Sequence, residues 1–228
     1  MSLRTCLFSA ASLALLAAST LSAHADGYTF TFSGGGLSGS GSFTTSNALV
    51  PGVPGAQQIT AIQGTFSDSN LGLTNAVISG VQATSLPSGI NPDGTFIPPG
   101  SQADGFGFSY DNLFFPAGNS PAVCPPDPNP ADNYPFGGGL FDIYGLLFNV
   151  QGGYTVDLWS NGVVPGLGLT YGVGDALDGT VQSTFGEPFS GQSVDISVAP
   201  TPEPSTFLFL GTGILGVAGA ARRRFLHS

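Results

Sequence analysis

Short stretches in which apolar and polar residues alternate fill the chain from Asp26 to Thr201. In "YTFTFS", Tyr28, Phe30 and Phe32 fall on one side and the threonines on the other, which is the two-residue period of a half-buried strand. Similar stretches follow, separated by Gly, Asn, Asp and Pro: "GSFTT", "QQITAIQGTF", "TNAVISGVQAT", "LFDIYGLLFNV", "YTVDLWS", "GTVQSTF" and "SVDISVA". No stretch in this region has a helical period. The pattern predicts an all-β fold, an antiparallel β-sandwich or jelly roll.

Charged residues are scarce, and the basic ones are confined to the ends of the chain. No Lys or Arg occurs between Thr5 and Ala221, and both histidines, His24 and His227, lie in the ends. The formal net charge is −10, which leaves no electrostatic footprint for nucleic acid and favours cations, including calcium, as charged partners. The 18 Phe and 6 Tyr residues indicate a folded domain despite 35 Gly and 18 Pro.

The amino-terminal residues have the three-part layout of a secretory signal peptide. Arg4 precedes an apolar run rich in alanine and leucine, and the small-x-small triplet from Ala23 to Ala25 follows it. This layout predicts a signal peptide over residues 1–25, with cleavage before Asp26. The passenger domain is then expected over residues 26–199.

The carboxyl-terminal residues predict a single transmembrane helix over residues 206–221. This run carries no charge, and a helix of that length spans roughly 24 Å, a little short of the hydrocarbon core. Arg222, Arg223 and Arg224 follow at once and can snorkel to the headgroups. Because cytoplasmic flanks carry the excess of Arg, these residues act as a cytoplasmic anchor, and everything before Pro204 should lie outside.

The segment "PEPST", the short Gly-rich apolar run and the final "RRR" together resemble the PEP-CTERM sorting signal of bacteria that produce exopolysaccharide. The resemblance covers residues 200–228. It implies that Pro202, Glu203 and Pro204 are read by exosortase, a membrane-embedded processing enzyme, which removes or exchanges the tail. It also implies export across the inner membrane, a transient membrane anchor, and a final place at the cell surface or outside the cell.

The passenger offers few groups for catalysis. Without Lys or His, most general-base and nucleophilic arrangements are unavailable, and a Ser-His-Asp triad is impossible. Two carboxylates could still hydrolyse glycosides, but spacing singles out no pair among the candidates Asp142, Asp157, Asp175 and Asp178. The sequence therefore predicts a protein that is not an enzyme, with no catalytic residue and no cofactor.

Binding motifs are equally weak. "GGGLSG", from Gly34 to Gly39, matches a dinucleotide fingerprint, but no helix opening or suitably spaced acid follows, so we expect a turn. Calcium could be bound by Asp127, Asn129 and Asp132 or by Asp175 and Asp178, but the first set lacks the glycine of an EF-hand loop. We interpret these carboxylates as solvated turn residues and predict no metal ligand. Trp159 is interpreted as a core residue, and Cys124 has no partner cysteine outside the signal peptide.

Two hypotheses for function follow. The first is an exported, non-enzymatic protein of the cell surface or of an extracellular matrix, associated with biofilm exopolysaccharide. The second is a ligand-binding module for polysaccharide, ice or calcium. The passenger itself resembles β-rich passengers of other PEP-CTERM proteins, a resemblance that implies no activity.

Overall fold

A computed structural model describes residues 27–83, 89–90, 96–97, 108, 110–122, 136–186, 191–201, 211–213 and 216. Residues Asp26–Thr201 form one compact unit. Its described secondary structure consists of strands, and every strand pair is antiparallel, so the predicted all-β antiparallel fold is confirmed.

Ten of the strands belong to a single sheet, in which nine follow one path and the short β7 (Leu113–Phe114) pairs with β3. The order along the path is β11-β10-β9-β8-β4-β3-β2-β1-β12. A separate ribbon pairs β5 (Gly89–Ile90) with β6 (Phe96–Ile97). The nine strands of the path are β1 (Gly27–Gly34), β2 (Leu37–Leu49), β3 (Gln57–Asp68), β4 (Leu73–Val81), β8 (Leu146–Val150), β9 (Tyr154–Val164), β10 (Gly168–Leu177), β11 (Thr180–Phe185) and β12 (Asp195–Pro200).

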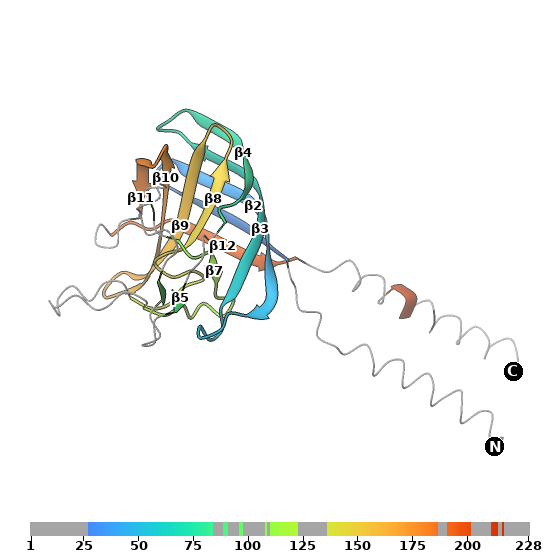
Figure 1. Cartoon of the computed structure of the whole chain (residues 1–228). Coiled ribbons are helices and arrows are strands. Elements are labelled where there is room, and N and C mark those ends of the chain that lie inside the picture. The colour runs from blue at the N-terminus through green and yellow to red at the C-terminus, as the bar shows by residue number, and fades with distance from the viewer. Residues whose placement is uncertain are drawn as a thin grey trace, which may run out of the picture. The chain divides into compact units, whose positions relative to one another are not determined.

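The sheet bends so that its two halves enclose a common core. In Figure 1, β8 and β9 cross in front of the blue strands β1 and β2. One apolar cluster contains side chains from both halves. Phe30, Phe43 and Phe66 come from the half formed by β1, β2 and β3, and Phe148 and Val173 come from the half formed by β8, β9 and β10. One continuous sheet therefore folds over itself around this core, where the sequence predicted a β-sandwich or jelly roll.

The alternating sequence of β1 and β2 explains their pairing. Phe30 and Phe32 are buried while Thr29 and Thr31 are exposed, as the two-residue period requires. The ring of Phe32 lies where a Cβ atom on Gly39 would stand, at 2.4 Å, so only glycine fits opposite it. Gly35 and Gly36 form the hairpin turn with φ of 59° and 91°, which confirms the turn expected in "GGGLSG".

Two strand predictions need correction. β10 was not expected, because its sequence "GLTYGVGDAL" is rich in glycine and aspartate and lacks a clear alternation. The stretch "LFDIYGLLFNV" was expected to be one strand, but only Leu146–Val150 is extended. Its first half is bent rather than extended, and Gly145, just before the strand begins, has a φ of 68°.

The sorting tail and the signal peptide lie largely outside the described residues. In the predicted span 206–221, residues 211–213 and 216 are described and are helical. Nowhere in the described part of the chain is a helix long and apolar enough to cross a membrane. The residues Ala23, Ala25, Pro202, Glu203, Pro204, Arg222, Arg223 and Arg224 are all outside it.

Candidate functional site

The outer face of β12, β1, β2 and β3 carries rows of hydroxyl groups that cross the strands. Thr31 stands opposite Ser40 on one side and Ser197 on the other, and Ser40 stands opposite Thr65. A second row runs through Ser33, Ser38 and Ser67, with Asp195 at its β12 end. We call this surface the hydroxyl face; its members are Thr29, Thr31, Ser33, Ser38, Ser40, Ser42, Thr65, Ser67 and Ser197.

Several hydroxyl groups of this face are free to bind a ligand. Among the described residues, Thr31, Ser33 and Ser40 make no side-chain hydrogen bond, and all three are exposed. At the margin, by contrast, Gln63 Nε2 donates to Ser42 Oγ at 3.2 Å and Thr29 Oγ1 donates to the carbonyl of Ala199 at 3.3 Å. Each free hydroxyl can donate one hydrogen bond and accept others, so the middle of the face offers a cluster of unused donors and acceptors.

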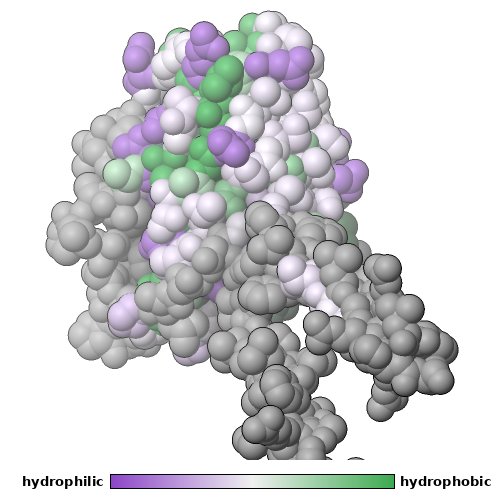
Figure 2. All heavy atoms as spheres, turned by 90° about the vertical axis from the view of Figure 1, so that its right-hand side faces the viewer, coloured by the Kyte–Doolittle hydropathy of each residue, from purple (hydrophilic) through white to green (hydrophobic). Residues whose placement is uncertain are grey.

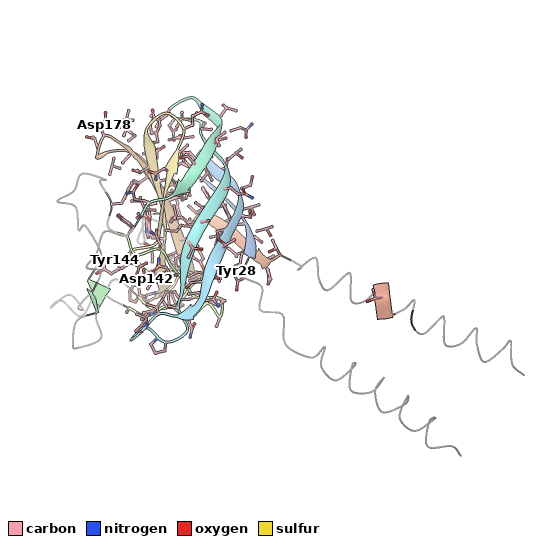
Figure 3. The ribbon with its side chains drawn as sticks, turned by 45° about the vertical axis from the view of Figure 1, so that its right-hand side comes forward. Tyr28, Asp142, Tyr144 and Asp178 are labelled. Atoms are coloured by element: carbon pink, nitrogen blue, oxygen red, sulfur yellow. The ribbon has the colours of Figure 1, made fainter. Side chains whose placement is uncertain are left out.

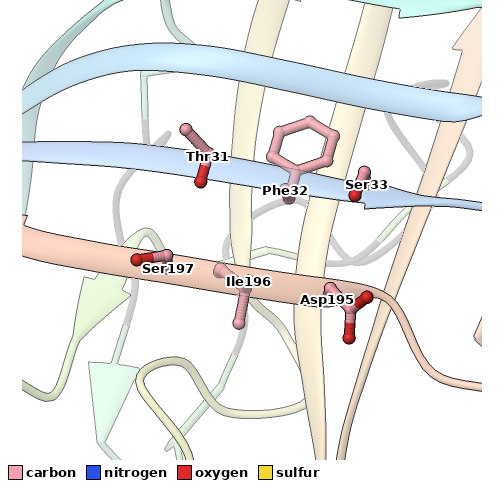
Figure 4. A pocket seen from close by; sticks show the side chains of 6 residues that line it. All are labelled: Thr31, Phe32, Ser33, Asp195, Ile196 and Ser197. Carbon is pink, nitrogen blue, oxygen red and sulfur yellow. The ribbon is translucent and has the colours of Figure 1, made fainter.

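A shallow pocket lies over the pair β1–β12 at the edge of this face. Figure 4 shows its lining residues side by side on the two strands, and they are Thr31, Phe32, Ser33, Asp195, Ile196 and Ser197. Asp195 supplies the pocket's one carboxylate. Much of the described surface in Figure 2 is pale, which means that its hydropathy is close to neutral. Because the members of the hydroxyl face are serines and threonines, with Asp195 beside them, the face is polar but nearly uncharged.

Unlike the exposed hydroxyl groups, several acidic side chains are buried. Asp111, Asp142 and Asp157 have exposed fractions of 0%, 2% and 3%. Asp111 Oδ1 accepts the Leu113 amide at 2.9 Å, and Asp142 Oδ1 accepts the Tyr144 amide at 2.9 Å. The second oxygens, Asp111 Oδ2 and Asp142 Oδ2, have no hydrogen-bond partner, and neither does Asp157 Oδ1.

Burial raises the pKa of all three carboxyl groups. For Asp111 the pKa rises well above its ordinary value, first because of burial and then because of the neighbouring charge of Asp142. For Asp142 burial again raises the pKa, and the neighbouring Asp111 carboxyl together with hydrogen bonds from the Tyr144 and Gly145 amides offsets part of the rise. For Asp157 burial raises the pKa well above the ordinary value. Raised carboxyl pKa values are typical of acid catalysts, but here no substrate can reach the groups without opening the fold.

The four aspartates considered as glycosidase candidates do not form one site. Asp142 and Asp157 influence each other electrostatically inside the fold, whereas Asp175 is paired with Asp68. Figure 3 places Asp178 at the opposite end of the unit from Asp142 and Tyr144. The interpretation of Asp175 as a solvated turn residue is wrong, since its exposed fraction is 0% and it lies inside β10. Asp178 is an exposed turn residue with a φ of 51°, as expected.

Sequence reasoning missed Asp68 and Asp111, which contribute to these buried pairs. A signal existed for Asp111, because it lies two residues before the apolar run Leu113–Phe115 in "YDNLFF", where a solvated carboxylate would be out of place. The hydroxyl face also had a signal, the serines at alternate positions of "LSGSGSF". What no pattern indicated was which strands would place their hydroxyl groups side by side.

The calcium candidates remain without support. No group of three or more His, Cys, Asp or Glu side chains within the described ranges is arranged to hold a metal ion. Asp127, Asn129 and Asp132 lie outside those ranges, as does Cys124.

Trp159 is a core residue, as predicted. Its exposed fraction is 9%, and its Nε1 donates to Asn161 Oδ1 at 3.0 Å. Its indole lies where a Cβ on Gly172 would stand, and the Phe108 ring is 6.2 Å from it. It therefore offers no open ring face for stacking on a sugar.

These features define the class of molecule: an all-β protein in which most acidic groups of the described residues are buried and the exposed strand face is hydroxyl-rich. The similarity to a known protein family lies in the carboxyl-terminal tail. Residues 200–224 match the family model described as the PEP-CTERM protein-sorting motif. The chain therefore carries the sorting motif of proteins that are exported and processed at the membrane by exosortase. No curated protein and no solved structure gives a significant match to it.

Proposed function

We propose that this protein is a non-enzymatic component of the cell surface or extracellular matrix, delivered through its sorting tail and bound there to a neutral polysaccharide. The sorting motif at residues 200–224 is the observation that carries the proposal, because it implies processing by exosortase. The absence of Lys, Arg and His between Asp26 and Ala221 and the burial of Asp111, Asp142 and Asp157 support a role without catalysis.

The tail acts by holding the chain at the membrane until it is cut. The apolar run 206–221 enters the bilayer, and Arg222, Arg223 and Arg224 stay on the cytoplasmic side. Pro202 and Pro204 keep the backbone extended just outside the bilayer, where a processing enzyme can reach it. The passenger follows the signal peptide out of the cell and is released from its anchor after export.

The sorting step is tested by changing Pro202, Glu203 and Pro204 together to Ala in the producing bacterium. We expect an uncut form that stays in the membrane fraction, detected by the mass of the chain and by fractionation. A control with Ser205→Ala and Thr206→Ala alters neighbouring residues of the same tail and should be processed normally. Normal release of the triple variant into the medium would refute the sorting role.

The polysaccharide partner is inferred from the chemistry of the hydroxyl face. The unused hydroxyl groups of Thr31, Ser33 and Ser40 match the donors and acceptors of sugar hydroxyl groups. With a net charge of −10, the protein repels acidic polymers, so a neutral polysaccharide fits better than one rich in uronic acid. Recognition rests on hydrogen bonds, because Tyr28, Phe30 and Phe32 on β1 point into the core.

Binding is tested with the full chain in detergent micelles against a neutral glucan and against alginate, an acidic polymer. The double variant Thr31→Val and Ser40→Ala removes the two central hydroxyl groups with little change in side-chain volume. We expect it to weaken glucan binding about tenfold, the loss of roughly 1.4 kcal/mol. Thr180→Val removes an exposed hydroxyl from β11 and serves as the control. Equal binding by wild type and double variant, or preference for alginate, would contradict the proposed partner.

An ice-binding module is the second candidate, because the hydroxyl face repeats along two directions. Along a strand, groups on one face recur at about 6.6 Å, and across strands at about 4.8 Å. An ice-recrystallisation assay on the wild type and on the same double variant separates this candidate from the first. Inhibition that the double variant loses, without any glucan binding, would favour ice over polysaccharide.

A further inference from the structure

A hydrogen-bonded group of two buried aspartates, Asp68 and Asp175, and the half-buried Ser183 joins β3 to the edge strand β11. Ser183 Oγ is hydrogen-bonded to Asp68 Oδ2 and, at 2.9 Å, to Asp175 Oδ1. The Ser183 amide donates to the same Asp175 oxygen at 3.1 Å. Asp68 lies at the end of β3 and Ser183 in β11, and four strands separate β3 from β11 in the sheet order. The contact therefore joins strands that are not neighbours in the sheet.

The number of available hydrogen atoms implies that one of the two carboxyl groups must be protonated. A serine hydroxyl has one hydrogen and can donate it to one acceptor at a time. Ser183 Oγ touches a carboxyl oxygen on each side, so one contact uses the serine hydrogen and the other needs a hydrogen on the carboxyl group. Asp68 Oδ1 already accepts the Asn70 amide at 2.7 Å, which leaves its Oδ2 as the atom that faces Ser183.

We propose that Asp68, Ser183 and Asp175 form a proton-dependent latch that ties the edge strand β11 to β3 when one proton is shared, and that releases β11 when the proton is lost. Without that proton two carboxylates with exposed fractions of 0% would face each other across one hydroxyl. Neither could then donate to Ser183, and their like charges would repel. The latch goes beyond the proposed function and does not depend on the sorting tail or on a polysaccharide.

No other titratable group within the described elements around the latch supplies a compensating positive charge. Lys, Arg and His are absent between Asp26 and Thr201. Asp178 lies in the exposed turn after β10. Asp157 on β9 stands opposite Gly174, so it points to the other side of the sheet from Asp175, which stands opposite the core residue Val156. Leu37 and Leu73, opposite Asp68 on β2 and β4, do not titrate.

The pH range follows from the shift of Asp175. Burial raises its pKa from 3.8 to about 6, hydrogen bonds from Ser183 offset part of the rise, and the charge of Asp68 adds to it. Because the folded pKa lies above the unfolded one, the stabilisation is complete below the unfolded value and is lost as pH rises through about 6. The latch is thus closed in acid and open at neutral pH.

The test compares hydrogen exchange of β11 (Thr180–Phe185) in the full chain, in detergent micelles, from pH 5 to pH 8. After correction for intrinsic rates, we expect exchange in the wild type to accelerate at least about tenfold over this range. Asp68→Asn supplies a permanent N–H donor at the position of Oδ2, so its β11 should stay protected at pH 8. Asp178→Asn removes the same charge from an exposed turn and should behave like the wild type.

Two results would overturn the latch: exchange of β11 in the wild type that does not depend on pH, or an Asp68→Asn variant that follows the wild type. If Asp68→Asn fails to fold, Ser183→Ala provides the second measurement. It removes the bridging hydroxyl, so β11 should exchange rapidly at both pH values. Protection of β11 in Ser183→Ala that still falls between pH 5 and pH 8, as in the wild type, would also exclude the latch.

Discussion

The two halves of the folded sheet are built on different principles. In the half formed by β1, β2 and β3, buried and exposed residues alternate, as with Phe30 and Thr31. In the half formed by β8, β9 and β10, nearly every residue is buried, with β9 buried from Val156 to Gly162. The first half has one face open, and the second has both faces covered.

The covering of the second half comes from segments outside the long strands. The Phe136 amide donates to the carbonyl of Asn161, and the Val163 amide donates to the carbonyl of Gly137, at 3.2 and 3.0 Å. Ser160 Oγ donates to the carbonyl of Gly138 at 2.9 Å. When both faces of a strand are covered, its polar side chains are buried as well. These side chains then need hydrogen-bond partners, and a buried carboxyl group can instead become protonated. The open half can present a surface, whereas the covered half depends on internal hydrogen bonds.

The largest effect expected in the covered half is the loss of the Asn112 side chain. Its Nδ2 donates to the carbonyl of Gln82 at 2.8 Å, and its Oδ1 accepts the Leu147 amide at 2.9 Å. Asn112→Ala leaves the buried Leu147 amide and the half-buried Gln82 carbonyl without these partners, so the free energy of unfolding should fall by about 2–5 kcal/mol. Denaturant titration measures the change.

Asn75→Ala is the matched control for this prediction. Asn75 also has a left-handed backbone, with φ of 49° against 59° for Asn112, but it is exposed on β4. The control should lose about 1 kcal/mol from the backbone alone. Equal losses for the two variants would mean that the hydrogen bonds of Asn112 contribute nothing and would break the contrast between the halves.

A smaller effect is expected at Asp157, and it depends on pH. Burial raises the folded pKa of this carboxyl group, so its favourable contribution is present in acid and is lost as pH rises. Asp157→Asn removes this dependence. The melting temperature of the variant minus that of the wild type should therefore become more positive as pH is raised. Asp195→Asn, in the exposed part of β12, is the control and should run parallel to the wild type. Parallel curves for all three proteins would show that Asp157 does not titrate on unfolding.

The smallest effects are expected from a pair of matched threonine substitutions. Thr170 has an exposed fraction of 3%, and its Oγ1 has no hydrogen-bond partner among the described residues. Thr170→Val should therefore raise the free energy of unfolding, by about 1 kcal/mol. Thr31→Val on the hydroxyl face should change it by less than about 0.5 kcal/mol. A loss at Thr170 would show that its hydroxyl is satisfied in solution and would weaken the contrast.

The two halves also differ in how far they could be predicted. β1 was predicted from "YTFTFS" because a strand with one open face repeats every two residues. β10 was missed because both of its faces are covered, which removes the alternation that identifies a strand. The same covering explains the error at Asp175, since an aspartate between Gly and Ala has the composition of a turn and only the neighbouring strands bury it.

The sequence by itself determined the sorting motif at residues 200–224, the all-β antiparallel fold and the internal position of Trp159, because each rests on a contiguous pattern. Tertiary structure alone decided which groups meet. Asp68 and Ser183 are 115 residues apart in the chain, and Thr31 and Ser197 become neighbours only because β12 returns to pair with β1. Local patterns report on the conformation of a few consecutive residues, whereas the latch and the hydroxyl face depend on strand order and on the bend of the sheet, which long-range packing selects.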